Sequence, residues 1–140
     1  MPEAGKAGKE SAMGGELHLD SIGQIHISVD DIDRAVAFYR DTLGMQLLFA
    51  FPEQAMAFFD CGGVRLYLGR AESDDFRSNP LIYYRVADIH AACATLKQRG
   101  VEFEGEPHVV HRTESQELWL AAFKDPEGNY VHLMSEIALG

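Results

Sequence analysis

The sequence has few cysteines and no long apolar run. It contains two cysteines in 140 residues, Cys61 and Cys93, and no Cys-x-x-Cys pair. This excludes a disulfide framework and is typical of a reducing compartment. No apolar run approaches the roughly 20 residues that cross a bilayer, and the first residues lack the apolar core of a secretory signal. We therefore expect a cytoplasmic protein with no membrane partner.

Positive charge is also scarce. Twelve Lys and Arg residues stand against 22 Asp and Glu residues, for a formal net charge of −10. Such a surface repels phosphate backbones, so we expect no nucleic-acid partner. G-x-S-x-G, phosphate-binding-loop and G-x-G-x-x-G motifs are absent from the sequence as well. What is present is a hydrophobic fraction of 46%, enough for one core.

The chain divides into a tail and one domain. Residues 1–18 are rich in Gly, Ala, Lys and Glu and show no periodicity, which predicts a disordered N-terminal tail. Residues 19–140 form the domain, with one module at about 22–69 and a second at about 80–136.

Hydrophobic periodicity predicts the elements of each module. In the first, a strand begins near Ile22, a helix over 30–44 is capped by Asp30 or Asp31 and stopped by Gly44, and three strands follow. The expected strands of module one are 22–29, 45–51, 55–60 and 64–68. In the second module we expect a strand over 81–86, a helix over 88–99, strands over 101–104, 118–124 and 130–134, and a long loop over 105–116.

The two modules repeat one pattern. Adding 57 converts Val29 to Val86 and Ile32 to Ile89, and adding 65 converts Phe58 to Phe123, Leu66 to Val131 and Leu68 to Leu133. Two units that match in order and in apolar phase indicate an internal duplication. We predict an α+β fold in which two βαβββ modules form a curved mixed-sheet cup, with the helices on its outer face.

The strand faces that point away from the helices are rich in aromatic and polar side chains. We interpret this face as a cup that binds a small molecule, and the alternative is a face buried against a partner subunit. The predicted cup residues are Gln24, His26, Ser28, Arg65, Tyr67, Tyr83, Arg85, Tyr130 and His132. Arg65 and Arg85 either hold an anionic ligand or pair with carboxylates such as Glu53 or Glu72.

The remaining reactive or aromatic residues favour structural roles. Cys93 lies on the apolar pattern of a helix and is expected in the core. We expect Cys61 to be an ordinary turn thiol rather than a nucleophile, and Trp119 to be a core anchor rather than a stacking platform. His90 and His108 receive no role, and no catalytic residue is assigned.

Two segments carry a family resemblance. Gln24 to Gly44 is similar to the opening strand and helix of the vicinal oxygen chelate superfamily, which includes glyoxalases, bleomycin-resistance proteins and extradiol dioxygenases. Lys124-Asp-Pro-Glu-Gly-Asn129 resembles the last hairpin of that fold, and the likeness extends from Ile22 to Glu136. The resemblance implies the two-module architecture and a homodimer, and it does not specify a reaction.

The resemblance also implies where a metal would bind. Metal-dependent members carry His or Gln, Glu, His and Glu at four cup positions, which correspond here to Gln24, Tyr67, Leu81 and His132. Gln24 and His132 can bind a metal, Tyr67 is a poor ligand, and leucine cannot serve. A site rebuilt from His26, His111 and His132 for Zn, Ni, Mn or Fe stays open.

Three hypotheses follow. The first is a binding protein of the bleomycin-resistance kind, which holds a small, anionic or aromatic molecule and needs no metal. The second is a metal-dependent lyase, isomerase or dioxygenase with a rearranged metal site. The third is a non-catalytic dimerisation domain. Whether the protein is an enzyme is left open by the sequence.

Overall fold

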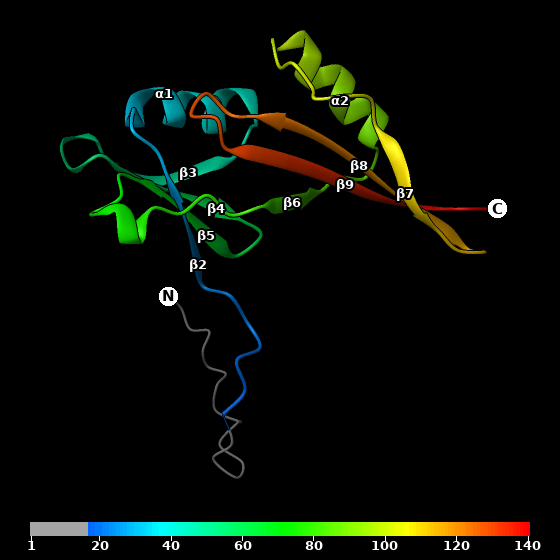
Figure 1. Ribbon diagram of the computed structural model, residues 1–140, viewed down its shortest axis with the longest axis horizontal. Helices are drawn as coiled ribbons and strands as arrows, with labels where there is room; N and C mark the ends of the chain where they lie inside the picture. The colour runs from blue at the N-terminus through cyan, green and yellow to red at the C-terminus, as the bar shows by residue number, and fades with distance from the viewer. Residues whose placement is uncertain (1–16) are drawn as a thin grey trace.

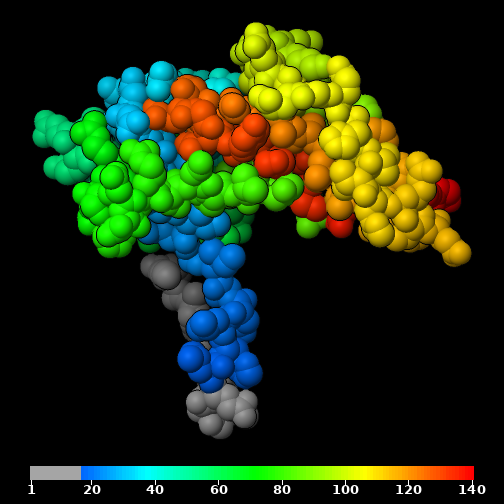
Figure 2. Space-filling view, viewed as in Figure 1, coloured from blue at the N-terminus to red at the C-terminus, as the bar shows by residue number. Residues whose placement is uncertain are grey.

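The computed structural model describes residues 17–140, and the predicted tail lies mostly outside this range. Residues 17–23 precede the first strand and project from the folded body (Figures 1 and 2). The exposed fractions of Leu17 and Leu19 are 82% and 90%.

The elements are β2 (Gln24–Ser28), α1 (Ile32–Ala37), η2 (Phe38–Thr42), β3 (Gln46–Phe51), η3 (Pro52–Gln54), β4 (Met56–Cys61), β5 (Val64–Gly69), η4 (Asp74–Phe76), β6 (Ile82–Arg85), α2 (Ile89–Gln98), β7 (His108–Arg112), β8 (Gln116–Lys124) and β9 (Tyr130–Ala138).

The strands form two four-stranded mixed sheets, ordered β2-β5-β4-β3 and β6-β9-β8-β7. In each sheet the first strand of the module runs parallel to its last strand, and the other pairs are antiparallel. Both helices lie on the same side of the two sheets (Figure 1). The predicted α+β fold with two βαβββ modules is thereby confirmed. No helix within residues 17–140 is long and apolar enough to span a membrane.

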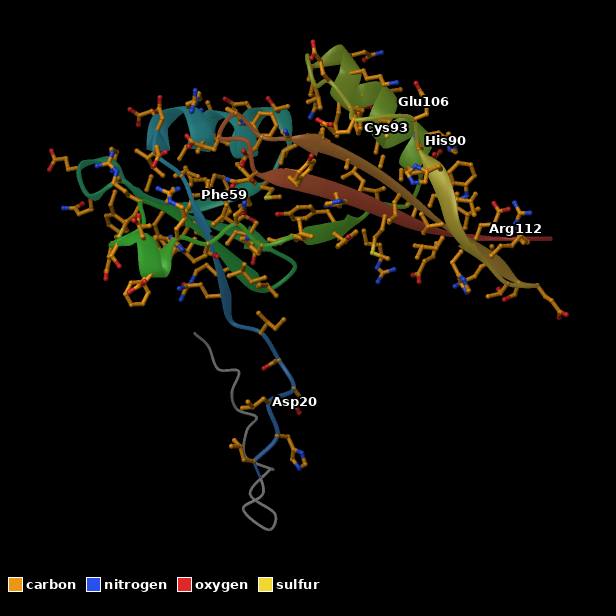
Figure 3. All side chains as sticks on the ribbon, viewed as in Figure 1. Asp20, Phe59, His90, Cys93, Glu106 and Arg112 are labelled. Carbon is orange, nitrogen blue, oxygen red and sulfur yellow. The ribbon has the colours of Figure 1, made fainter. Side chains whose placement is uncertain are left out.

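Each module has its own core between helix and sheet. Phe59, Leu66 and Leu68 are buried beneath α1, where Figure 3 places Phe59. Phe123 and Leu133 have the same role beneath α2, together with Cys93. Alternate strand residues face the helices and are buried in these cores, among them Ile27, Leu66, Leu68, Val131 and Leu133. The expected burial of Cys93 is confirmed, because only 3% of the residue is exposed.

The pairing register corrects one pair of the predicted repeat. Phe59 is paired with Leu66, and Phe123 is paired with Val131. Phe59 and Phe123 are both fully buried, at 0% exposure. The counterpart of Phe123 is therefore Phe59, and the prediction of Phe58 was wrong by one residue. The reason is the hairpin turn, which is one residue longer in module two, so the offset of 65 holds only after the turn.

The edge strand of module two was also predicted at the wrong place. Residues 101–104 form no strand and contribute only a single bridge from Phe103 to Phe123, whereas β7 lies inside the predicted loop 105–116. The register of β7 shifts between Val109 and His111. This bulge breaks the alternation of apolar and polar residues by which a strand is recognised. Strand β3 has the same irregularity between Leu47 and Phe49, so β7 is its counterpart.

The helix of module one starts as predicted and ends differently. The Asp31 side chain accepts a hydrogen bond from the Arg34 backbone N–H, which caps α1. After Ala37 the helix widens into the π-helical turn η2, in which the Leu43 N–H donates to the Phe38 carbonyl at 3.0 Å. This turn brings Phe38 against Phe123 of the other module, with ring centroids 6.3 Å apart.

A polar clasp joins the modules. It consists of Asp125, Glu127 and Asn129 of the β8–β9 turn and their partners in module one. Asp125 accepts a 2.8 Å hydrogen bond from the buried Tyr39 hydroxyl. Glu127 accepts the backbone N–H groups of Asp30 and Asp31 at 2.8 and 3.0 Å and pairs with Arg34 at 3.0 Å. The turn of module two thus holds the N-terminus of α1, which fixes the two sheets relative to each other.

Candidate ligand-binding site

A row of aromatic rings crosses the whole first sheet on the face opposite α1. The pairing register aligns Phe49 with Phe58, Phe58 with Tyr67, and Tyr67 with His26, across β3, β4, β5 and β2. Phe58 and Tyr67 stack with ring centroids 4.7 Å apart and planes inclined by 18°. His26 lies 4.6 Å from Tyr67, and Phe49 lies 6.3 Å from Phe58. These four residues, called the ring row below, form a continuous aromatic surface, in which the Phe49 and Phe58 planes are inclined by 73° and the His26 and Tyr67 planes by 53°.

Arg65 stands next to the ring row. Its Nε donates to the Gln24 side-chain oxygen at 3.0 Å, and its guanidinium carbon lies 5.7 Å from the centroid of the Phe58 ring. Among residues 17–140 it forms no ion pair with a carboxylate. The side chain therefore offers a positive charge without a direct ion pair, although Asp60 lies opposite it on β4, and it offers further N–H donors beside the rings.

Two hollows adjoin this surface. The first is lined by the rings of Phe49, Phe51 and Phe58 together with Arg65 and measures about 440 Å³. The second, of about 380 Å³, lies on the other side of Tyr67 and reaches Phe76. Both volumes fall in the range of small-molecule sites, about 300–1,000 Å³.

A glycine makes room for the Tyr67 ring. A Cβ atom at Gly69 would lie 2.6 Å from Cε1 of Tyr67. Such a contact is shorter than two carbon atoms tolerate, so the ring can lie across the end of β5 only because residue 69 has no side chain. The position of the ring row thus depends on Gly69.

Module two presents a smaller aromatic surface. Tyr83 stacks on His132 with centroids 4.4 Å apart and planes inclined by 28°, and Tyr130 lies 6.0 Å from His132. Burial lowers the pKa of His132, so its imidazole is neutral near pH 7. Its Nδ1 is buried and has no hydrogen-bond partner among residues 17–140. Arg85 forms an ion pair with Glu136, so a carboxylate compensates its charge. The partner is neither Glu53 nor Glu72, the two carboxylates suggested by the sequence.

The predicted cup residues therefore fall into two groups. Gln24, His26, Arg65 and Tyr67 meet on the first sheet, and the second sheet brings together Tyr83, Tyr130 and His132. Ser28 is 4% exposed, because the backbone of Ser78 covers it and donates to its hydroxyl oxygen at 2.7 Å. We therefore leave Ser28 out of the site proposed below.

Sequence reasoning missed Phe49 and Phe58. Phe58 was aligned with Phe123 in the repeat and was not placed on the cup face, and the alternation in β3 is broken by its bulge. The signal that could have found them is the run of phenylalanines in Phe49-Ala-Phe51 and Phe58-Phe59, which is more aromatic than one buried face requires.

The donors at the family's metal positions do not fit a divalent ion. The Gln24 oxygen already accepts from Arg65, the Tyr67 ring is stacked, and Leu81 has no donor atom. His111 is exposed on the edge strand β7 rather than folded over the cup. Within residues 17–140 no three His, Cys, Asp or Glu side chains are grouped as a metal site requires. We derive no reaction step through a metal.

Cys61 and Trp119 have the surroundings of structural residues. Burial raises the pKa of the Cys61 thiol, and the nearby Asp60 raises it further, so the thiolate nucleophile is disfavoured. Trp119 packs against the core of module two and its indole N–H donates to Glu117 at 3.1 Å. The expectation of a core anchor at Trp119 is confirmed.

Comparison with known proteins identifies the class that this fold and surface define. The model of the Glyoxalase/Bleomycin resistance protein/Dioxygenase superfamily matches residues 21–133, and the chain belongs to this superfamily. It is 26% identical over 123 residues to the uncharacterized protein YraH of Bacillus subtilis (strain 168), covering 79% of this chain and 94% of that protein.

Solved structures with the same fold have different functions. A lactoylglutathione lyase from Agrobacterium tumefaciens superposes with a TM-score of 0.69 at 22% identity, covering 83% of this chain and 93% of that one. TnmS3, an antibiotic-binding protein from Streptomyces sp. CB03234, gives 0.67 at 25% identity, with coverages of 86% and 98%. A superfamily member from Sphaerobacter thermophilus DSM 20745 gives 0.65 at 28% identity, with coverages of 85% and 99%. These likenesses support the family and leave the activity to be argued from the site.

Proposed function

We propose that the protein binds a planar aromatic anion in the cup and does so without a metal ion. The observation that carries this proposal is Arg65, an exposed cation beside the ring row whose partner is the neutral amide of Gln24. Rings of a ligand can pack against the ring row, in edge-to-face or offset contact, while its carboxylate or phenolate accepts from the guanidinium. The antibiotic-binding function stated for TnmS3 supports a binding role over a catalytic one.

We further propose that a second copy of the chain completes the cup. Large apolar side chains are exposed on the cup faces of both modules, including Phe49 at 52%, Leu81 at 61% and Tyr83 at 44%. Exposed apolar surface of this kind marks an interface or a ligand site. In the proposed homodimer, the ring row of one chain faces the Tyr83–His132 pair of its partner, and the ligand lies between them. Sedimentation at two concentrations measures the dimer directly.

The test is a fluorescence titration with 2-naphthoate, a flat aromatic carboxylate. Replacing Arg65→Gln should weaken its binding by about tenfold to a hundredfold, since a hydrogen bond to a charged group contributes about 1.5–3 kcal/mol. The uncharged 2-methylnaphthalene, which has no hydrogen-bond acceptor for the guanidinium, should bind both forms equally. Arg40→Gln is the matched control, because Arg40 pairs with Asp41 on the far side of the sheet. Equal affinities of wild type and Arg65→Gln for 2-naphthoate would refute the proposal.

A second arm tests the metal. Dialysis against a chelator should leave the 2-naphthoate affinity unchanged. Stoichiometric Zn, Ni, Mn or Fe that is lost in His132→Ala and required for binding would favour the metalloenzyme hypothesis instead. If none of the aromatic compounds binds while the dimer persists, the dimerisation-domain hypothesis is the better account.

A further inference from the structure

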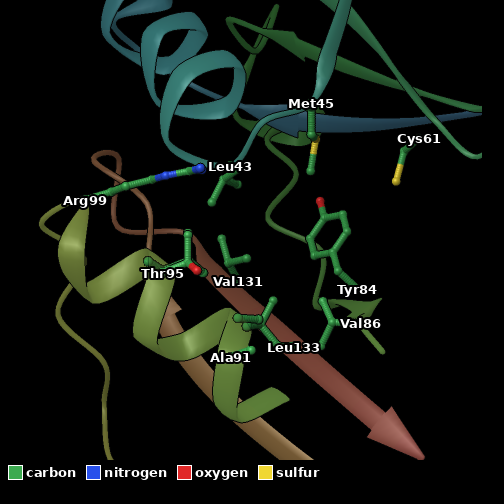
Figure 4. Close-up of a pocket in the computed structure, with 12 residues that line it drawn as sticks. Leu43, Met45, Cys61, Tyr84, Val86, Ala91, Thr95, Arg99, Val131 and Leu133 are labelled. Carbon is green, nitrogen blue, oxygen red and sulfur yellow. The ribbon is translucent and has the colours of Figure 1, made fainter. Parts of the chain in front are cut away.

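A further hollow, separate from the two beside the ring row, lies between the modules on the helix side of the sheets (Figure 4). It measures about 450 Å³. Val131 and Leu133 of β9 form its floor, Ala91 and Thr95 of α2 form one wall, and Leu43 and Met45 of module one stand opposite. We call this hollow the inter-module cleft.

The cleft and the cup lie on opposite faces of the same two strands. Successive side chains of a strand point to opposite faces. Tyr84 therefore faces the cleft while its neighbour Tyr83 faces the cup, and Leu133 and His132 divide in the same way. Because α2 packs against β8 and β9, the helix side of β6 is left to line the cleft.

One hydrogen-bond donor in the cleft has no partner. The Tyr84 hydroxyl makes no hydrogen bond within residues 17–140, although the side chain is half-buried. Burial raises its pKa, as do the nearby Cys61 and Asp125, so the hydroxyl keeps its proton. Figure 4 shows it pointing between Met45 and Cys61. The hydroxyl is open to water in the cleft, so a ligand that displaces this water must supply an acceptor in its place.

The charges around the cleft select an uncharged ligand. No Asp or Glu lines it, although the chain has 22 acidic residues, so a buried cation would find no counter-ion. Its one charged lining residue, Arg99, donates to the Thr42 carbonyl at 2.8 Å, and the carbonyl ends of η2 and α2 beside it offset its positive charge. The C-terminal ends of η2 and α2 meet at this rim, and the carbonyl ends of helices disfavour an anion.

We propose that the inter-module cleft binds an uncharged apolar molecule with one hydrogen-bond acceptor, a ketone or an ester, which accepts from the Tyr84 hydroxyl. The apolar walls remove its hydrocarbon part from water, and the single donor fixes its orientation. A ligand there contacts Leu43 and Met45 from one module and α2 from the other, so it ties the modules together from the side opposite the cup.

The probe is prodan, an uncharged naphthalene dye with a propionyl ketone whose emission shifts to the blue in apolar surroundings. We expect saturable binding with a blue shift. Tyr84→Phe keeps the ring and removes only the hydroxyl, and it should weaken binding about threefold to tenfold, the equivalent of one hydrogen bond. The titrations are repeated with Phe58→Ala, which removes the centre of the ring row. Equal affinities in the two backgrounds place the dye outside the cup, whereas a loss in Phe58→Ala overturns the assignment.

A pair of helix variants tests the location. Ala91→Phe fills the cleft and should abolish binding, whereas Ala94→Phe adds the same side chain at an exposed position of α2 that does not line the cleft. Thermal unfolding of both variants checks that they fold. If Ala91→Phe does not fold, Tyr84→Phe decides alone. Unchanged binding in Ala91→Phe, or an equal loss in Ala94→Phe, overturns the proposal.

Competition tests the charge of the ligand. Methyl decanoate should displace prodan at a concentration at least tenfold below that of decanoate, because only the carboxylate places an anion at the helix ends. Equal or better competition by decanoate overturns the claim that the ligand is uncharged. Failure of prodan to bind the wild-type chain overturns the proposal for the inter-module cleft. It does not bear on the ligand binding proposed for the cup.

Discussion

The two modules hold the same pair of side chains at the centre of their cup faces, with the strands exchanged. In module one His26 lies on the first strand and Tyr67 on the last, and in module two Tyr83 lies on the first strand and His132 on the last. The parallel register pairs them directly in both cases, with ring centroids 4.6 and 4.4 Å apart. A duplicated register keeps two rings in contact whichever strand carries each of them.

The modules differ in what surrounds this pair. Phe58 continues the row beside Tyr67, whereas Ala122 occupies the place beside His132. Arg65 meets only an amide, whereas Arg85 is paired with a carboxylate. Module one therefore carries the exposed cation and the larger aromatic surface on which the proposed ligand binding rests. Module two has the smaller surface, which is suited to closing over it.

The largest expected effect concerns the turns that join each module's last two strands. Asp125 is buried and accepts from Tyr39, Glu127 and Asn129, whereas Asp60 in the turn of module one accepts only from the Gly63 N–H at 3.2 Å. Asp125→Ala leaves several buried donors unsatisfied, at about 1–3 kcal/mol each, so we expect a loss of about 4 kcal/mol in the free energy of unfolding. Asp60→Ala should cost less than about 1 kcal/mol. Urea denaturation measures both.

Equal losses in the two variants would contradict the comparison. Tyr39→Phe distinguishes the stabilisation by the contact between the modules from the stabilisation within the β8–β9 turn. It removes one partner of Asp125 and leaves the turn hydrogen bonds intact, so its loss should fall between the other two.

The next effect concerns Glu127, whose place in module one is taken by the Gly62–Gly63 turn. Burial alone would raise the pKa of Glu127, but the hydrogen bonds from Asp30, Arg34 and Asp31 outweigh it and lower the pKa below the ordinary 4.5. A carboxyl with a depressed pKa stabilises the fold above pH 4.5, and this contribution is lost as the pH falls through the depressed pKa. Glu127→Gln should cost about 2 kcal/mol at pH 7.

The pH dependence checks the sign. The stability difference between wild type and Glu127→Gln should shrink as the pH falls below 4.5. Glu53→Gln, an exposed position, should follow the wild type throughout. A difference that stays constant down to pH 3 would show that the charge of Glu127 is not what stabilises the clasp.

A smaller effect is expected at Gly69, whose counterpart in module two is Met134. A side chain fits at Met134 because the neighbouring ring is the imidazole of His132, whereas at Gly69 it would strike Tyr67. Gly69→Ala should cost about 1–3 kcal/mol through overpacking. Tyr67→His in the same chain copies the module-two arrangement and should recover much of that loss. A double-mutant cycle by urea denaturation measures the coupling, and additive losses would contradict the explanation.

The sequence predicts those parts of the fold that depend on neighbouring residues. The alternation of Ile25, Ile27 and Val29 and the capping Asp31 are local signals, and the structure has the strand and helix start that they indicate. Strand β7 is not predicted, because its bulge places Val109 and Val110 side by side and removes the alternation. An edge strand is paired on one side only, and β7 has no other local signal.

The candidate site was only partly predictable for the same reason. Alternation places Tyr67 and His132 on the cup faces, because side-chain direction is a property of one strand. The ring row requires the register of four strands at once, and a turn longer by one residue was enough to match Phe58 instead of Phe59 with Phe123. The ion pair of Arg85 with Glu136 likewise depends on how far β9 extends beyond Met134, where the prediction ended it.

The smallest effect concerns the ionisation of His132 and the ring above it. Its pKa is lowered because burial disfavours the imidazolium, and Tyr83 stacked at 4.4 Å is part of that cover. Tyr83→Ala should therefore return the pKa toward the ordinary 6.5, which NMR of the imidazole protons resolves. Because the neutral form is favoured on folding, this contribution is present above pH 6.5 and is lost as the pH falls through the titration of His132. Tyr84→Phe, on the opposite face of β6, should leave the titration in place. If Tyr83→Ala leaves the titration in place as well, the strands beneath His132 lower its pKa and the stacked Tyr83 ring does not. The exchanged His–Tyr pair would then contribute to packing only, with no effect on the ionisation of His132.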